Sequence, residues 1–154
     1  KTHELGAGAE FTASLGGKSG QEDQYPFEGR FRIETLSNGE FPFTGVMFGG
    51  FTASLGPMAV LRVLDTPADV RVVIGSVRCQ CLDQAIFRHI GIEPAEQRIV
   101  AVKSSVHFRA DFESIAGSIL MVEAPGAHPC RLDKITYHNL RPGMRLGPGG
   151  RPHE

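Results

Sequence analysis

The sequence predicts a mixed α/β fold in a single domain, in which N-terminal antiparallel strands and a hairpin precede a β-α-β-α-β parallel unit. Residues 26–36 alternate apolar and polar side chains, as expected for a strand with one face in water. Residues 70–74 and 99–102 are short β-branched runs, typical of buried strands, and amphipathic segments that end at glycine follow them. A length of 154 residues is consistent with one domain.

The first predicted strand covers residues 6–15 and ends at Gly16-Gly17-Lys18, a turn that could present backbone N–H groups and an ammonium to an anion. After the strand at 26–36, Ser37-Asn38-Gly39 predicts a type I′ hairpin turn and a return strand beginning at residues 41–43. Residues 51–56 repeat residues 11–16 letter for letter. Since the flanks differ, we interpret the repeat as two similar strands that could be neighbours in one sheet.

Six further elements alternate along the rest of the chain: strands at 58–64, 70–74, 99–102 and 119–122, and helices at 83–90 and 106–116. The β-branched character of residues 70–74, continuous except at Arg71, predicts a central strand. Ser104 or Ser105 could cap the second helix, and Gly117 would end it. Right-handed crossovers would make the last three strands parallel, with both helices covering a face of the sheet.

The chemistry of the chain is concentrated where the strand at 99–102 meets the following helix. In open α/β sheets, ligands bind at the carboxyl ends of the strands. The loops after residues 74 and 102 should therefore bring together a set of polar side chains: Ser76, Arg78, Gln80, Lys103, Ser104 and His107. Near the start of a helix, His107 could bind an anion or transfer a proton. The alternative is that His107 only satisfies a backbone group and Lys103 is only solvated.

Metal and nucleotide motifs are absent from the sequence. Cys79-x-Cys81 lacks the spacing and the second pair of a zinc site, and with Cys130 distant we interpret these cysteines as small buried residues. His3-Glu4 lacks the second histidine of a zincin helix, and no Walker loop or nucleophile elbow occurs.

Composition narrows the class of protein. The balance of 16 basic and 17 acidic residues gives no electrostatic reason to expect nucleic acid or membrane binding, and no apolar run is long enough to span a bilayer. Three cysteines favour a reduced, cytoplasmic setting. The chain does not begin with Met, and residues 141–154 are rich in Gly and Pro. We therefore expect the C-terminal piece of a longer protein, with a domain at 1–140 and a flexible tail at 141–154.

Several segments together resemble one known family over residues 6–126: Leu15-Gly16-Gly17-Lys18, residues 36–39, residues 55–61, Gln80-x-x-Asp83-x-x-x-Phe87 with residues 91–94, and residues 99–110 with 123–126. Lys-Ser-Ser-x-His-Phe-Arg-Ala at residues 103–110 is the most specific of them. The chain resembles the C-terminal domain of the microcystinase C (MlrC)-like zinc metallopeptidases.

This resemblance implies a two-part enzyme. The zinc-binding aspartate and histidines of the family lie in a larger N-terminal domain, and nothing here matches them. A zinc-bound water in that missing domain would attack the substrate carbonyl. The partners implied are the chain's own N-terminal domain and a peptide or other small amide substrate, with a homo-oligomer possible. The namesake of the family hydrolyses linearised microcystin peptides, and this fragment alone should be inactive.

Within that scheme, the polar corner would bind a substrate carboxylate or stabilise an oxyanion. We expect the main catalytic contributions from Lys103, His107 and Gln80. Substrate contacts would come from four further side chains: Arg78, Ser104, Arg109 and Lys18. Arg109 could equally form an ordinary i,i+4 ion pair with Glu113. The alternative function is a non-catalytic ligand-binding, interdomain or dimerisation module.

Overall fold

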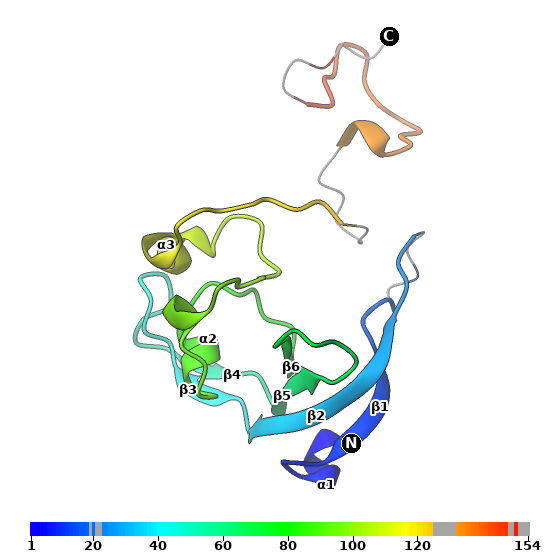
Figure 1. The fold of residues 1–154 in the computed structure, drawn as a ribbon. Coiled ribbons are helices and arrows are strands. Elements are labelled where there is room, and N and C mark those ends of the chain that lie inside the picture. The colour runs from blue at the N-terminus through cyan, green and yellow to red at the C-terminus, as the bar shows by residue number, and fades with distance from the viewer. Residues whose placement is uncertain (19, 21–22, 125–131, 148–149, 151–154) are drawn as a thin grey trace. The chain divides into compact units, whose positions relative to one another are not determined.

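The structure is a computed structural model that describes residues 1–18, 20, 23–124, 132–147 and 150. The chain divides into two compact units. The larger unit comprises Lys1–Ala13 and Glu28–Leu120, and the second comprises Ser14–Phe27 and Met121–Glu154. Every predicted site residue except Lys18 belongs to the larger unit, whose strands and helices are drawn in Figure 1.

A four-stranded sheet forms the main framework. Its strands, in spatial order, are β1 (Glu10–Leu15), β2 (Phe27–Ser37), β5 (Met58–Val63) and β6 (Arg71–Gly75). β5 pairs antiparallel with both β2 and β6. In β2 the side chains of Phe31 and Ile33 are fully buried while Arg30 and Arg32 are exposed, so the predicted strand with one wet face is confirmed.

The predicted hairpin is only partly correct. Gly39 adopts a positive φ of 76°, and its N–H donates to the Ser37 hydroxyl at 2.9 Å, as expected for a turn. The strand that follows, β3 (Glu40–Pro42), does not return along β2 but pairs with β4 (Thr52–Ser54) in a second sheet. Both edges of β2 are already occupied, by β1 and β5.

That pairing also places the repeated hexapeptide in two different sheets. The first copy overlaps β1 and the second overlaps β4, so the two copies are not neighbouring strands. The turn at Gly39 is specific for glycine, because a Cβ there would collide with the carbonyl oxygen of Gly56.

The predicted parallel unit is wrong. Of its three expected strands, at 70–74, 99–102 and 119–122, only the first forms, as β6, and it pairs antiparallel with β5. β6 is therefore an edge strand of the sheet, not a central one. Residues 99–102 and 119–122 run without strand pairing, and Ile99 is 87% exposed. An apolar β-branched run becomes a strand only where another strand offers it an edge.

The helices are shorter than predicted. They are α1 (Thr2–Leu5), α2 (Ala85–Arg88), η1 (Pro94–Glu96), α3 (Arg109–Phe112), η2 (Glu113–Ile115) and η3 (Leu132–Lys134). The helix expected over residues 106–116 contains only the four α-helical residues of α3 before it tightens into the 3₁₀ turn η2. No helix in the described ranges is long and apolar enough to cross a membrane.

A hydrophobic cluster joins the second sheet to α2. It comprises Phe41, Ala53, Leu55, Met58, Ala85 and Ile86, with Phe43, Val73 and Cys81 packed against it. His89, just after α2, stacks on the ring of Phe41 at a centroid distance of 4.0 Å. This cluster anchors the loop that runs from β6 to α2, and that loop carries Gln80.

Candidate functional site

Three of the predicted site residues lie together. The Gln80 side-chain oxygen is 2.8 Å from Nδ1 of His107, and the Gln80 side-chain nitrogen donates to the Ser104 hydroxyl at 3.2 Å. Ser104 also accepts a hydrogen bond from the backbone N–H of Phe108 at 3.3 Å. We name Gln80, Ser104 and His107 the polar cluster.

The polar cluster is held by a second connection of the same spacing. Gln80 and His107 are 27 positions apart, and so are Gln84 and Asp111 one helical turn further along each segment. The Asp111 carboxylate accepts from the Gln84 backbone N–H at 2.6 Å, and the Gln84 side chain donates to the Asp111 carbonyl at 2.6 Å. The segments 80–84 and 107–111 thus lie side by side and are joined by hydrogen bonds at both ends.

A fully buried carboxylate anchors the same region. Oδ2 of Asp83 accepts hydrogen bonds from the backbone N–H groups of Thr44 at 2.9 Å and Gly45 at 2.7 Å. Its Oδ1 accepts from the Ala85 N–H at 2.8 Å. Backbone donors replace the water that a buried carboxylate loses, and charge-assisted hydrogen bonds of this kind stabilise it.

Gly45 lies between the two aspartates. A Cβ built on this glycine would be 3.0 Å from Oδ2 of Asp83 and 3.2 Å from Cγ of Asp111. A side chain at this position would crowd both carboxylates, which approach the loop closely. The loop after β3, the segment before α2 and the helix α3 therefore meet at one point, beside the polar cluster.

The sequence analysis did not predict the buried hydrogen bonds that Asp83 and Gln84 form. Asp83 entered it only as a helix-start residue within a family motif, and Asp111 only as a position within the helix predicted at 106–116. A usable signal existed, because Asp83 and Gln84 interrupt an otherwise apolar stretch that continues into α2. Polar side chains in such a stretch need buried partners.

The charged residues expected at the site are arranged differently. Arg109 is engaged: its guanidinium is 3.0 Å from Glu113 and lies over the Phe108 ring at 5.5 Å. Lys103 is exposed and lines an apolar groove, and Arg78 is exposed in the loop that carries Gln80. Lys18 belongs to the second compact unit. Catalytic or substrate-binding roles for these residues remain predictions.

The cluster has a defined hydrogen-bonding polarity. The Gln80 oxygen can only accept, so with this orientation of the amide the proton of a neutral His107 is on Nδ1. Nε2 then carries the lone pair and can accept a hydrogen bond or a proton from a bound molecule. His107 is exposed, whereas Gln80 and Ser104 are half-buried, so the imidazole is the accessible end of the cluster.

The two cysteines in the described part of the chain, Cys79 and Cys81, both have thiol pKa values raised by burial. Burial raises the pKa of the Cys81 thiol to about 12, and the charges of Cys79, Asp83 and Asp111 act in the same direction. Cys79 is exposed, so the prediction that both residues are buried is wrong for it. Desolvation still raises the pKa of the Cys79 thiol. Cys130 lies outside the described residues.

The described residues do not fit a metal ion. Within those ranges, no three His, Cys, Asp or Glu side chains come together as ligands. The carboxylates of Asp83 and Asp111 are already occupied by backbone donors. We therefore derive no chemical step on this chain through a metal.

Comparison with known proteins extends these observations. Residues 1–139 match the family model of the MlrC C-terminus. Microcystinase C from Sphingomonas sp is 31% identical over 119 residues, which cover 77% of this chain and 22% of that protein. A crystal structure named as a candidate metallopeptidase, from Mesorhizobium sp. BNC1, is similar with a TM-score of 0.64 at 25% identity, and the match covers 75% of this chain and 22% of that one.

The chain thus spans 22% of the length of each of these two proteins. The match over residues 1–139 covers most of the sequence, including both sheets, α2, α3 and the polar cluster. The resemblance predicted from the sequence is confirmed: the chain belongs to the MlrC C-terminus family.

Proposed function

We propose that this chain is the C-terminal, non-metal-binding domain of a metal-dependent hydrolase, and that its polar cluster contacts the substrate. The observation that carries the proposal is the pairing of Gln80 with His107 at 2.8 Å, supported by Ser104. The names of the two relatives support a hydrolase of the metallopeptidase class. The metal, zinc by family resemblance, would be held elsewhere in the longer protein.

The roles follow from the hydrogen bonds. Gln80 orients His107 by accepting from Nδ1–H, so that Nε2 is left with the lone pair. Ser104 holds the Gln80 amide in that orientation. Nε2 of His107 would accept a hydrogen bond from a substrate N–H or take a proton during amide hydrolysis. Exposed Lys103 and Arg78 would attract the carboxylate of a peptide substrate.

The test uses the longer protein and a linearised microcystin peptide as the probe, with hydrolysis followed by chromatography. His107→Ala and Gln80→Ala are expected to lower kcat/KM on the order of 100-fold, the scale of losing one positioned hydrogen-bonding group. Lys103→Ala should raise KM more than it lowers kcat, because it removes attraction present in ground and transition states alike.

Matched controls separate chemistry from folding. Ser104→Ala should lower kcat/KM, while Ser105→Ala, which removes an exposed hydroxyl one residue away, should not. Circular dichroism and thermal melting of each variant would exclude unfolding. Full activity of both His107→Ala and Gln80→Ala would reduce the polar cluster to a structural element and overturn the proposal.

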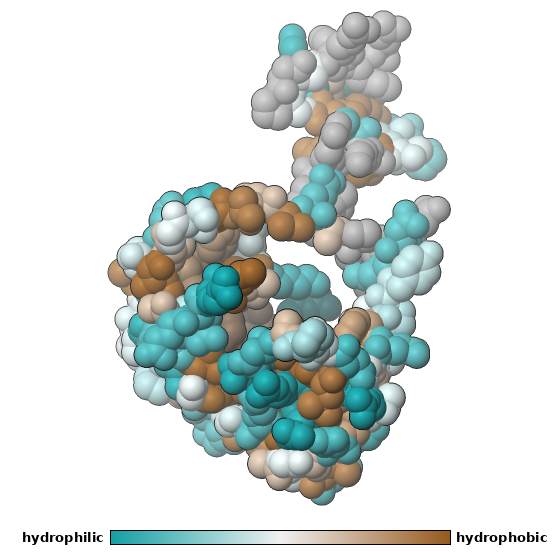
Figure 2. Space-filling model, viewed as in Figure 1, coloured by the Kyte–Doolittle hydropathy of each residue, from teal (hydrophilic) through white to brown (hydrophobic). Residues whose placement is uncertain are grey.

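A second candidate function is a non-catalytic interdomain module. Apolar side chains support it, since Val46 is 84% exposed and Phe51 is 67% exposed in the larger unit. Apolar colour reaches the visible surface at several places in Figure 2. Large exposed apolar groups are typical of surfaces that another part of a protein covers. If the chain is such a module, variants of the polar cluster should leave kcat/KM of the longer protein unchanged.

A further inference from the structure

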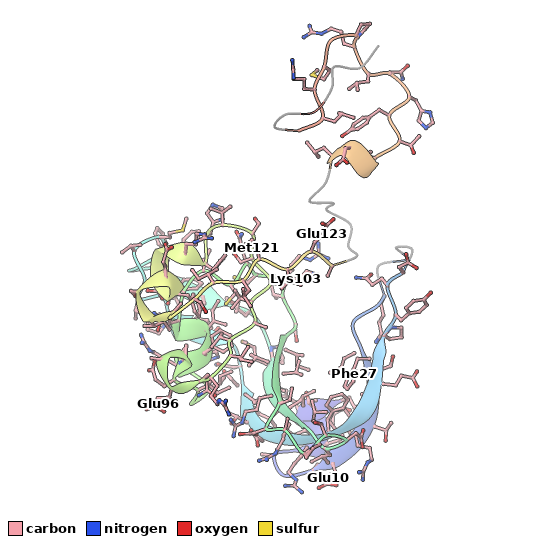
Figure 3. The ribbon with its side chains drawn as sticks, turned by 45° about the horizontal axis from the view of Figure 1, so that its top comes forward. Glu10, Phe27, Glu96, Lys103, Met121 and Glu123 are labelled. Atoms are coloured by element: carbon pink, nitrogen blue, oxygen red, sulfur yellow. The ribbon has the colours of Figure 1, made fainter. Side chains whose placement is uncertain are left out.

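An apolar groove of about 690 Å³ lies along β6 in the larger unit. Val72 and Val73 of β6 line one side, α2 contributes Ile86 and Phe87, and the unpaired segment at residues 99–103 lines another side. Lys103, at the end of that segment, and Glu96, shortly before its start, are labelled in Figure 3. We name this feature the β6 groove.

The outer edge of β6 has no strand partner in the part of the chain that the structure describes. The Val63 N–H donates to the Val70 carbonyl at 2.9 Å, and the same register pairs Leu61 with Val72 and Ala59 with Ile74. In an antiparallel ladder only every second residue bonds to a given neighbour. The N–H and C=O groups of the alternate residues therefore face away from β5: Arg71, Val73 and Gly75.

No strand in the described residues pairs with this outer edge. The side chains of β6 are also less buried than those of the neighbouring strand β5. Val60 and Leu61 of β5 are 1% and 0% exposed, whereas Val72 and Val73 of β6 are only half-buried. Across the groove, Ile99 is 87% exposed. Open apolar strand edges promote aggregation, so proteins usually cover them.

We propose that the β6 groove receives an extended strand from the remaining polypeptide of the longer protein, paired with Arg71, Val73 and Gly75. An extended segment is the occupant that a free strand edge selects, since its own N–H and C=O groups complete the ladder. The groove walls would hold alternate apolar side chains of that strand.

The source of the strand follows from chain length and linkage. This chain accounts for 22% of the length of each of its two relatives, so most of such a protein lies outside it. A segment of the same polypeptide competes for the groove at high effective concentration, whereas a second copy has to be recruited from solution. The inference goes beyond the proposed function, because it does not involve the polar cluster or activity.

The first test places a photo-crosslinking amino acid at Ile99 in the longer protein. Irradiation should link Ile99 to a segment outside this chain within the same molecule, identified by mass spectrometry. A crosslinker at neighbouring Arg98, which is exposed but does not line the groove, is the matched control and should give little of this product. A link between two copies, or none at all, would overturn the proposal.

The second test measures backbone amide exchange over residues 70–75 of the longer protein. Pairing predicts exchange at Arg71, Val73 and Gly75 slowed on the order of 100-fold relative to open amides. Ile99→Asp should remove much of that protection, because it puts a charge against the inserted strand. Since Ile99 is exposed in this chain, the substitution should not itself destabilise the fold. Arg98→Asp, at a residue outside the groove lining, should leave the protection unchanged. Fast exchange at all three amides in the unmodified protein would end the proposal. Neither readout depends on hydrolysis, so failure of the proposed function would leave both tests intact.

Discussion

The Gln80 side-chain oxygen lies 2.8 Å from Nδ1 of His107, although 27 positions separate the two residues. The contact assigns the proton of neutral His107 to Nδ1, because a carbonyl oxygen can only accept. We expect two-dimensional ¹H–¹⁵N NMR of the imidazole to show the Nδ1–H form. Gln80→Leu should shift His107 toward the Nε2–H form, which is the usual preference of an isolated ring. An unchanged spectrum in Gln80→Leu would mean that the contact does not control the ring.

Asp83 should be among the most sensitive polar positions for stability. Asp83→Ala leaves the N–H groups of Thr44, Gly45 and Ala85 without their acceptor in a buried site. We expect a loss of about 3 kcal/mol in the free energy of unfolding, measured in urea, since several buried donors lose a charged partner. Thr44→Val removes only a 3.4 Å contact to the same carboxylate and should cost less than about 1 kcal/mol. Similar losses in both variants would contradict this assignment.

A side chain at Gly45 should destabilise the fold. Gly45→Ala would bring a methyl group 3.0 Å from Asp83 Oδ2 and 3.2 Å from Asp111 Cγ, so one carboxylate or the loop has to move. A destabilisation of about 2 kcal/mol is expected for this overpacking. Gly117→Ala is the matched control, because nothing lies within 4 Å of a Cβ at that position. Thermal melting of the two variants checks the difference, and equal midpoints would show that the loop at Gly45 adjusts freely.

The parts of this fold that were predictable from sequence are those decided by local pattern. The alternation in β2 and the turn at Gly39 are examples, because side-chain periodicity and positive φ leave direct marks in the residue order. The pairing partners of the strands could not be predicted from the residue order in this way. The Asn-Gly turn leads into a second sheet, and β6 lies at an edge despite its β-branched run.

The polar cluster was found from the wrong architecture. Gln80 and His107 were expected to meet at the carboxyl ends of two parallel strands, yet residues 99–102 form no strand. The two side chains meet instead because Gln84 and Asp111 tie the segment before α2 to α3. The sequence predicted that Gln80 and His107 lie together. It did not predict the carboxylates of Asp83 and Asp111, whose partners come from segments distant in the chain.

The two thiols should differ in reactivity. Both cysteines line the β6 groove, but Cys79 is exposed and can be reached by a reagent, whereas Cys81 is half-buried. A thiol reacts as its thiolate, and burial raises the Cys81 pKa to about 12, so about one Cys81 thiol in ten thousand is ionised near pH 8. Iodoacetamide labelling with peptide mass spectrometry should modify Cys79 well before Cys81.

The pH dependence of that labelling gives a stricter test. The Cys81 rate should keep rising about tenfold per pH unit up to the alkaline limit of the folded state, because its thiolate fraction is far from saturation. Adding urea should raise the Cys81 rate toward that of Cys79 as burial is lost. Cys79→Ser is the control, because it removes the thiolate charge of Cys79 beside Cys81. Labelling of Cys81 should remain slow in this variant, since burial is the largest cause of its raised pKa. Rapid labelling of Cys81 in the folded protein near pH 8 would contradict the buried environment.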